Sequence, residues 1–477
     1  MRIVVCIKHV PDVQSERRIE DGRLVRGEED VLNELDENAV EAAVALAEEA
    51  DGEVIALTMG PEDAEDGVRR ALQMGADSGV VVADDDLAGA DVVTTARVLA
   101  AAIERIGEVD LVIGTHNIHK LIDLIKEKEG QKESHMLATE MEDNVFHAVP
   151  TKRFQKFFAW VPIMNGCNKF CTYCIVPYVR GREVSRPLEE IVEEIRNLAK
   201  EGYKEITLLG QNVNSYGLDF KDGTDFSALL YAIEDIDGIE RVRYMTSHPK
   251  DMTFTMIDAI AQCKKVVSHI HLPVQSGSTE LLKRMNRGYT TEHYEELVSY
   301  IREKMPQAVL TTDIIVGFPG ETEAMFQETL DLLRRVRYDM AYTFIYSPRT
   351  GTPAATMDNQ IPQDEKSRRL KRLADVQNEI SLAYNVEMEG KDYEVIVEGP
   401  TKNDENHWFG RTRGNKMIIW ENDGTSAVGD TIRVHVDKGQ TWVLKGHVLK
   451  REEDCGRRNE VNAHDEAVSG SQGDMCR

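Results

Sequence analysis

In the middle of the chain, apolar and β-branched runs alternate with helical patterns about six times, and this alternation constrains the fold more than any other feature. Strands are predicted at 205–209, 241–246, 269–272, 309–316 and 340–346, with helices that include 188–200 and 322–335. Repeats of this kind build parallel sheets, and their number predicts a partial (β/α) barrel. We expect the functional site at the carboxyl ends of these strands.

Three cysteines, Cys167, Cys171 and Cys174, lie in the loop after the first strand of this barrel. Their Cys-x3-Cys-x2-Cys spacing supplies three thiolates and leaves a fourth metal position open. A structural zinc site closes with a fourth cysteine or histidine at regular spacing, and none follows here. A reactive iron–sulfur cluster with one free iron is therefore favoured over structural zinc and over three reduced structural thiols.

Residues 1–114 form a separate strand and helix pattern with a different composition. Strands are predicted at 3–7, 54–58, 79–83 and 109–113, and helices at 36–50, 61–74 and 91–106, which together indicate a parallel sheet covered on both faces. This segment holds 10 basic and 27 acidic residues, a net charge of −17 out of −27 for the whole chain. The acidity is thus concentrated in the first quarter and does not exclude a basic surface elsewhere.

The chain is predicted to be an α/β protein of several parts. Five short strands at 393–397, 409–412, 417–420, 431–436 and 442–448 indicate a small carboxyl-terminal β-barrel. The predicted parts are an α/β domain at 1–113, a connecting segment at 114–152, the partial barrel at 153–386, the small barrel at 387–450 and a polar tail at 451–477.

Several classes of protein are disfavoured. The sequence has no apolar run of membrane-spanning length and no signal-peptide pattern, so we expect a cytoplasmic protein without a membrane partner. Seven cysteines, three of them clustered, argue against a disulfide framework. His116 and His119 lack nearby cysteine or carboxylate partners, so a surface or capping role is favoured over metal binding.

The amino-terminal motifs at 7–12, 35–41 and 71–77 resemble the electron transfer flavoprotein β subunit over residues 1–113. This resemblance implies a nucleotide near Cys6, Asn33 and Met59. The later glycine- and aspartate-rich nucleotide loop of that family has no counterpart here. A purely structural α/β layer is therefore an equal alternative.

The cysteine spacing, with Tyr173 before the last thiolate, resembles the radical S-adenosylmethionine superfamily. Four motifs, 171–182, 209–216, 271–278 and 313–321, resemble the methylthiotransferases, and the resemblance runs from about residue 110 to about 450. The branch that it resembles most acts on tRNA and adds a methylthio group to C2 of N6-isopentenyladenosine beside the anticodon. A methylthiotransferase that acts on a ribosomal protein is an alternative with the same core chemistry.

The resemblance implies roles for particular residues. Cys167, Cys171 and Cys174 would hold one 4Fe-4S cluster whose open iron binds S-adenosylmethionine. A single electron would then break the sulfonium bond and give a 5′-deoxyadenosyl radical. The residues expected to contact the cofactor are Tyr173 on its adenine, Gln211, Asn212 and Ser247 on its polar groups, and the Gly317 backbone at the adenine edge.

The small barrel resembles a TRAM domain, which implies an RNA-binding role. Arg411, Arg413 and Lys416 surround one turn and would meet tRNA phosphates, with aromatic side chains of residues 407–409 nearby for stacking. A solvated basic turn is the alternative. The implied partners are tRNA and a one-electron reductant such as flavodoxin or ferredoxin, and we expect a monomer.

The sequence departs from the methylthiotransferase pattern at its amino-terminal end. Full members of the family carry three further cysteines that hold a second 4Fe-4S cluster, which takes part in sulfur delivery. Residues 1–166 contain only Cys6, and Cys263, Cys455 and Cys476 share no spacing. We therefore expect one cluster, with radical formation intact and the sulfur-transfer step in question. The alternative from another class is an inactive or partial fusion that acts as a nucleotide-binding or electron-transfer module.

Overall fold

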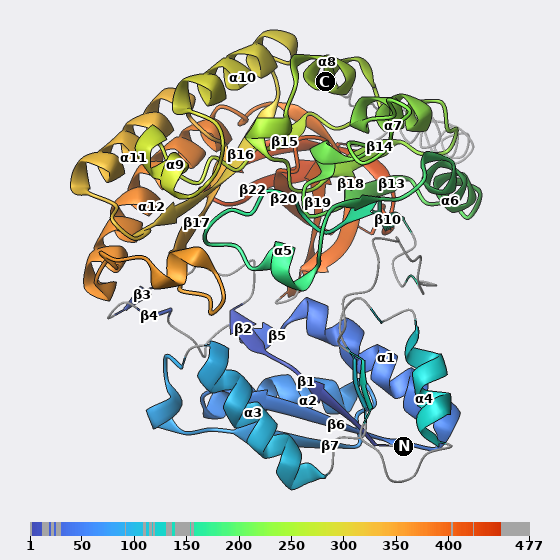
Figure 1. Cartoon of the computed structure of the whole chain (residues 1–477). Coiled ribbons are helices and arrows are strands. Elements are labelled where there is room, and N and C mark those ends of the chain that lie inside the picture. The colour runs from blue at the N-terminus through green and yellow to red at the C-terminus, as the bar shows by residue number, and fades with distance from the viewer. Residues whose placement is uncertain are drawn as a thin grey trace, which may run out of the picture. The chain divides into compact units, whose positions relative to one another are not determined.

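The computed structural model describes residues 2–11, 19–20, 23–24, 30–90, 92–107, 111–113, 117, 120–129, 136–138, 153, 157–401, 404–422 and 424–449. The predictions for His116, His119 and the tail with Cys455 and Cys476 fall outside these residues. The chain divides into two compact units, residues 1–142 and 143–477 (Figure 1). None of the described helices combines the length and the apolar character that a membrane crossing requires.

The first unit is built on a parallel sheet in the order β1-β6-β7. Alanine and valine side chains from the strands and from two helices form its core, among them Val40, Val54 and Val68. The elements of the sheet and its helices are β1 (Arg2–Cys6), β6 (Glu53–Met59), β7 (Ser78–Val82), α1 (Glu34–Ala50), α2 (Glu65–Gln73) and α3 (Val92–Ile106). Smaller elements are β2 (His9–Pro11), β3 (Ile19–Glu20), β4 (Arg23–Leu24), β5 (Asp30–Leu32), η1 (Glu62–Ala64) and η2 (Asp85–Leu87).

The segment predicted as a connection contains regular structure. Residues Leu121–Glu129 form α4, and Met136–Ala138 form β9. The strand predicted at 109–113 is found as β8 (Leu111–Ile113), and it pairs in parallel with β9. Short elements of this kind carry little periodicity in a polar sequence, and for this reason they were not predicted.

The second unit begins with six parallel strands arranged as a partial barrel. They form two sheets, β10-β13-β14 and β15-β16-β17, which a parallel bridge between Val242 and Val266 connects. Alternate residues such as Leu208 and Ile314 point outward into one large apolar core beneath the helices. The strands are β10 (Phe158–Pro162), β13 (Glu205–Leu209), β14 (Arg241–Tyr244), β15 (His269–His271), β16 (Val309–Val316) and β17 (Met340–Ile345).

Helices cover the outside of these strands (Figure 1). Threonine side chains at 253, 290 and 322 cap three of them by accepting a hydrogen bond from the backbone N–H three residues later. The helices are α6 (Leu188–Lys200), α7 (Phe226–Glu234), α8 (Phe254–Gln262), α9 (Thr279–Arg284), α10 (Thr291–Lys304), α11 (Glu323–Val336) and α12 (Gln363–Val386). Shorter elements are β11 (Met164–Asn165), α5 (Val176–Val179), β12 (Val184–Ser185), η4 (Val213–Ser215), η5 (Pro249–Asp251) and η6 (Pro353–Thr356).

The carboxyl-terminal strands form a closed barrel in the order β18-β19-β20-β22-β21. Its core contains the fully buried Trp420 together with valine and isoleucine side chains. The strands are β18 (Asp392–Thr401), β19 (Asp404–Thr412), β20 (Met417–Glu421), β21 (Thr431–Gly439) and β22 (Leu444–Val448). The prediction of a five-stranded barrel is confirmed.

Candidate functional site

The three cysteines lie in one loop between β11 and α5, beyond the carboxyl end of β10. Cys171 is buried, Cys167 and Cys174 are partly exposed, and all three are free thiols. The loop begins at Gly166, whose φ is +76°. A Cβ atom at this position would lie 1.9 Å from the carbonyl oxygen of Arg182, so only glycine fits the entry to the loop.

Neighbouring segments fix this loop by hydrogen bonds to its backbone. The N–H of Thr172 donates to the carbonyl of Met285 at 3.0 Å. The Asn286 amide donates to the carbonyl of Phe170 at 2.9 Å, and the Asn168 N–H donates to the Glu183 carboxylate at 3.1 Å. The loop is therefore held in place by contacts that do not use the thiols.

The surroundings of the thiols favour a metal centre as their partner. The pKa of Cys167 is raised to about 11, mainly by burial and then by Glu183 and the two other cysteines, while a backbone hydrogen bond lowers it. Burial also raises the pKa of Cys174. A bound metal centre stabilises such groups as thiolates, since it supplies the positive charge that they lack.

The donor set fits a cluster better than a single ion. Among the described residues, no three histidine, cysteine or acidic side chains enclose one metal ion. The three thiolates of an iron–sulfur cluster bind three different iron atoms, so they need not converge on one point. Three free thiols on one short, anchored loop meet this requirement.

Polar side chains gather at the carboxyl ends of the neighbouring strands. Gln211 and Asn212 follow β13 and Ser247 follows β14, as predicted, and the structure adds His248 and Gln275. Each carries a buried polar atom that has no hydrogen-bond partner among the described residues: Gln211 Oε1, Asn212 Oδ1, Ser247 Oγ, His248 Nε2 and Gln275 Oε1. Because buried polar atoms are rarely left unpaired, this group fits a polar ligand.

This polar group is connected to the cysteine loop. Lys169 of the loop forms an ion pair with Asp251 at 2.5 Å, and Asn212 donates to the same carboxylate at 2.7 Å. Thr246 and Gln275 hold left-handed backbone conformations with φ of +65° and +68°. Non-glycine residues of this kind are uncommon and cluster at functional sites, so the strand ends combine strain with unpaired polar atoms.

Arg287, a buried arginine that was not predicted from the sequence, contacts Tyr173 and lowers the pKa of His248. Tyr173 packs beside a small apolar cluster that contains Met285 and Phe318. Arg287 donates to the Tyr173 hydroxyl and to Cys171 Sγ, both at 3.4 Å. Burial lowers the pKa of His248, and the charges of Arg287 and Lys169 lower it further, so this imidazole is neutral. The contact of Tyr173 with a cofactor adenine remains a prediction.

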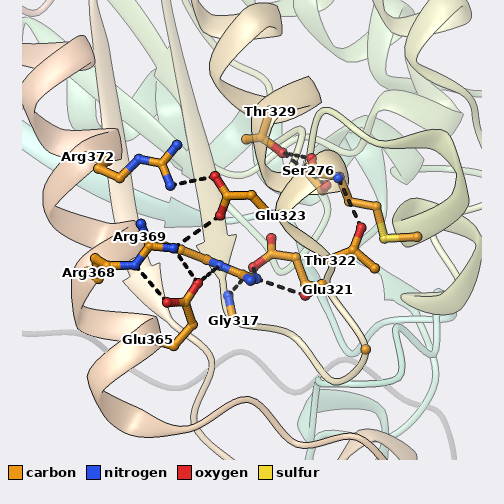
Figure 2. A network of polar contacts seen from close by, with 12 residues as sticks. Ser276, Gly317, Glu321, Thr322, Glu323, Thr329, Glu365, Arg368, Arg369 and Arg372 are labelled. Carbon is orange, nitrogen blue, oxygen red and sulfur yellow. Dashed lines mark hydrogen bonds and ion pairs between the residues drawn. The ribbon is translucent and has the colours of Figure 1, made fainter.

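Gly317 directly follows β16 and belongs to a polar network that connects to α12 (Figure 2). Its N–H donates to the Glu321 carboxylate at 2.7 Å, which also accepts from Arg369 of α12 at 2.7 Å. A Cβ atom at Gly317 would lie 2.3 Å from Cγ of Lys366. Close packing against α12 therefore explains this glycine, while the predicted approach to an adenine edge remains a prediction.

The three predicted RNA-binding cations lie where the small barrel meets the partial barrel. Arg413 donates to the carbonyls of Lys264 and, at 3.2 Å, Val266. Lys416 is largely buried and pairs with Asp339 of the partial barrel at 3.0 Å. Arg411 is more exposed and pairs with Glu398 of its own barrel at 3.0 Å. Since all three have intramolecular partners, their contact with RNA remains a prediction that now competes with a structural role.

Two arginines of β14 complete this interface from the other side. Arg241 donates to the carbonyl of Arg411 at 2.9 Å, and Arg243 donates to the carbonyl of Thr412 at 3.1 Å. The basic turn thus docks on the strands through its backbone as well as through its side chains.

The predicted nucleotide positions of the first unit lie at element ends. Cys6 ends β1 and is exposed, Met59 ends β6, and Asn33 caps α1 by accepting from the N–H of Leu35 at 2.9 Å. Capping accounts for Asn33 without a nucleotide. Nucleotide binding at these residues remains a prediction.

Comparison with known proteins connects these features. Residues 161–333 match the radical SAM superfamily, residues 386–449 match the TRAM domain and residues 21–119 match the electron transfer flavoprotein domain. Over 341 residues the chain is 52% identical to the tRNA-2-methylthio-N(6)-dimethylallyladenosine synthase of Desulforamulus reducens, covering 72% of this chain and 74% of that protein. The synthase of the same name from Carboxydothermus hydrogenoformans is 50% identical over 350 residues, covering 73% of this chain and 79% of that protein.

The chain belongs to this family of radical SAM methylthiotransferases. The radical SAM match supports the predicted fold class. The separate match of residues 21–119 confirms the predicted likeness to the electron transfer flavoprotein. The radical SAM family implies a 4Fe-4S cluster and S-adenosylmethionine as cofactors. Among solved structures, a radical S-adenosylmethionine methyltransferase from Kitasatospora setae aligns with a TM-score of 0.45 and 15% identity, covering 66% of this chain and 74% of that one.

Proposed function

We propose that this methylthiotransferase acts on tRNA and adds a methylthio group to C2 of N6-isopentenyladenosine beside the anticodon. The observation that carries the proposal is the anchored loop of three free cysteines beside five unpaired, buried polar atoms at the strand ends. The names of relatives at 50–52% identity support the substrate. They do not favour the alternative of an inert fusion.

We assign the cofactors to the residues that lie beyond the carboxyl ends of the strands of the partial barrel. Cys167, Cys171 and Cys174 would ligate one 4Fe-4S cluster, and Gln211, Asn212 and Ser247 would bind polar groups of S-adenosylmethionine. Tyr173 and Gly317 remain candidates for its adenine. When bound, the pair of cofactors supplies a 5′-deoxyadenosyl radical through one-electron cleavage of the sulfonium bond. The chemistry that this pair would supply is removal of hydrogen from an unactivated carbon such as C2 of adenine.

The sulfur-transfer step cannot use a second cluster bound by the amino-terminal part of this chain, because that part has no second set of cysteine ligands. Residues 1–166 contain Cys6 alone, and one thiolate cannot hold a cluster. We therefore propose one cluster per chain and a sulfur donor that is not a second resident cluster. The boundaries 1–113, 153–386 and 387–450 remain our proposal for the parts that divide these tasks.

The inner face of the partial barrel offers a surface for the modified base. Apolar residues of the strands point outward, whereas Trp160 of β10 and both Tyr342 and Phe344 of β17 are about half exposed. These strands are the first and last of the six, so their rings flank the open side of the barrel. Exposed aromatic rings stack on bases and contact a prenyl group, and we propose them for N6-isopentenyladenine.

The RNA itself requires cations that are free of protein partners. Lys438 and Lys445 lie opposite each other on β21 and β22, both exposed, beside the exposed Trp442. Neither lysine takes part in an ion pair among the described residues. Like charges placed opposite each other destabilise a sheet, so an anionic partner would relieve them. We propose that this hairpin contacts tRNA phosphates.

The remaining partners follow from the chemistry. The cluster needs one electron for each cleavage, and we propose flavodoxin or ferredoxin as the donor. A tRNA substrate and an oxygen-sensitive cluster are consistent with a cytoplasmic monomer.

The deciding experiment is nucleoside analysis of tRNA from a strain that lacks its methylthiotransferase, complemented with this chain. We expect 2-methylthio-N6-isopentenyladenosine with the wild-type chain and none with Cys171→Ala. Release of 5′-deoxyadenosine without the methylthio product would show radical formation but refute the complete activity. Modification of a ribosomal protein instead of tRNA would assign the other branch of the family.

A further inference from the structure

Arg287 is a buried cation beside the cysteine loop. It lies between α9 and α10, and only 5% of its surface is exposed. Its guanidinium donates to the Tyr289 hydroxyl at 3.2 Å, to the Pro273 carbonyl at 2.7 Å, and to Cys171 Sγ and the Tyr173 hydroxyl at 3.4 Å each. One side chain thus touches a predicted cluster ligand and the aromatic residue that precedes the last ligand.

The charge of Arg287 has no carboxylate to balance it among the described residues. Other buried arginines of this unit have one: Arg369 pairs with Glu321 at 2.7 Å, and Arg243 pairs with Glu205 at 2.9 Å. Among the described residues, Arg287 instead donates to two phenols, a carbonyl and a thiol. A buried charge without a counter-ion is strongly unfavourable, so a fold that retains one points to an anion beside it in the complete protein.

Of the contacts of Arg287 with the described residues, Cys171 is the one that becomes an anion when it binds iron. A 4Fe-4S cluster with three thiolates has a net negative charge, which increases by one unit when an electron enters. We propose that Arg287 is a positioning residue that serves as counter-ion to the cluster and makes its one-electron reduction more favourable. This inference rests on the proposed cluster. The step transfers one electron from the external reductant to the cluster and breaks no bond.

The test compares Arg287→Met and Arg287→Lys with Arg182→Met in the full chain, reconstituted anaerobically with iron and sulfide. Arg182 is the matched control, because it is an exposed cation of the same region that lies 4.4 Å from the Phe170 ring. The midpoint potential of the cluster is measured by redox titration with electron paramagnetic resonance. We expect Arg287→Met to disfavour reduction at least tenfold, a shift of about 59 mV to more negative potential. Arg287→Lys should restore part of the shift, and Arg182→Met should shift it far less.

A second readout separates a counter-ion from a structural arginine. The rise in melting temperature on cluster loading should shrink in Arg287→Met, because the variant loses its favourable contact only in the loaded state. An equal loss of stability in the apo and loaded proteins would overturn the proposal, as would an unchanged potential in Arg287→Met. Loss of iron from folded Arg287→Met and also from folded Arg287→Lys would overturn it. Arg287→Lys keeps the positive charge, so a counter-ion role predicts that this variant retains the cluster. If the wild-type chain bound no cluster, the proposed function itself would fail.

Discussion

Removing Arg369 should loosen the turn that ends β16, and the structure sets the size of the effect. The Glu321 and Arg369 side chains are 1% and 6% exposed, and the carboxylate accepts at 2.7 Å from both the guanidinium and the Gly317 N–H. Arg369→Met leaves the carboxylate buried without its cation. Breaking a buried pair in this way costs about 3–5 kcal/mol.

Hydrogen exchange measured by mass spectrometry on the full chain is a suitable assay, because it reports opening of the Gly317 turn without a two-state assumption for the whole protein. A loss of about 3–5 kcal/mol corresponds to exchange roughly 10²- to 10⁴-fold faster in peptides that cover residues 310–322. The rest of the partial barrel should exchange at nearly the wild-type rate.

Arg372→Met is the matched control, since Arg372 lies on α12 like Arg369 and pairs with Glu323 of α11 at 2.7 Å. These side chains are 32% and 52% exposed, so this pair should contribute no more than about 1 kcal/mol. Equal exchange rates in Arg369→Met and Arg372→Met would refute the reasoning, because burial would then make no difference.

The exchange rate of the turn in Arg369→Met should also depend on pH. Burial raises the pKa of Glu321 even with Arg369 present, and removal of the cation should raise that pKa further. A folded state whose pKa lies above the unfolded value binds more protons, so its stability falls as pH rises. The exchange defect of Arg369→Met should therefore shrink at lower pH, and a defect that grows there would contradict this account.

Three further predictions concern the cluster and the domain interface. Iron and sulfide analysis of the reconstituted chain should give about four of each per chain, and about eight would show a second cluster. Gly166→Ala should lower the iron content, because its Cβ would lie 1.9 Å from a carbonyl oxygen. Gly202→Ala is the control: its Cβ would have no heavy atom within 4 Å, so this variant should keep full iron content despite a comparable positive φ. Lys416→Met should expose the contact between the two barrels to limited proteolysis, with Lys438→Met as the exposed control, because Lys416 pairs with the largely buried Asp339.

Spacing and periodicity identified the parts of this protein that depend on local sequence. The five strands of the small barrel and the strands of the partial barrel follow from runs of β-branched residues, and the cysteine loop follows from its spacing. The placement of Gln211, Asn212 and Ser247 at strand ends was also accessible, because the end of a strand is a local property. The unpaired state of their oxygens is visible only in three dimensions.

Residues whose role depends on distant partners were missed or were assigned too simple a role. Arg287 is separated from Cys171 by 116 positions, and no local pattern indicates that they touch. Arg413 and Lys416 have the composition of an RNA-binding turn, but carbonyls at 264 and 266 and a carboxylate at 339 occupy them. A basic turn in sequence has the same appearance whether its partner is a phosphate or another domain.

The occupied state of Arg413 and Lys416 leads to the last prediction, which concerns where the small barrel meets RNA. Lys438 and Lys445 are exposed and form no ion pair with the described residues, so Lys438→Gln and Lys445→Gln should each reduce the salt dependence of binding to a prenylated anticodon stem-loop. The slope of log affinity against log salt should fall by about 0.7–0.9 for each lost phosphate contact. Trp442→Ala should weaken binding by about 1–3 kcal/mol with an unchanged slope, because stacking releases no counter-ions. If Arg411→Gln lowered the slope and neither lysine variant did, the RNA would lie on the predicted basic turn and the hairpin assignment would be wrong.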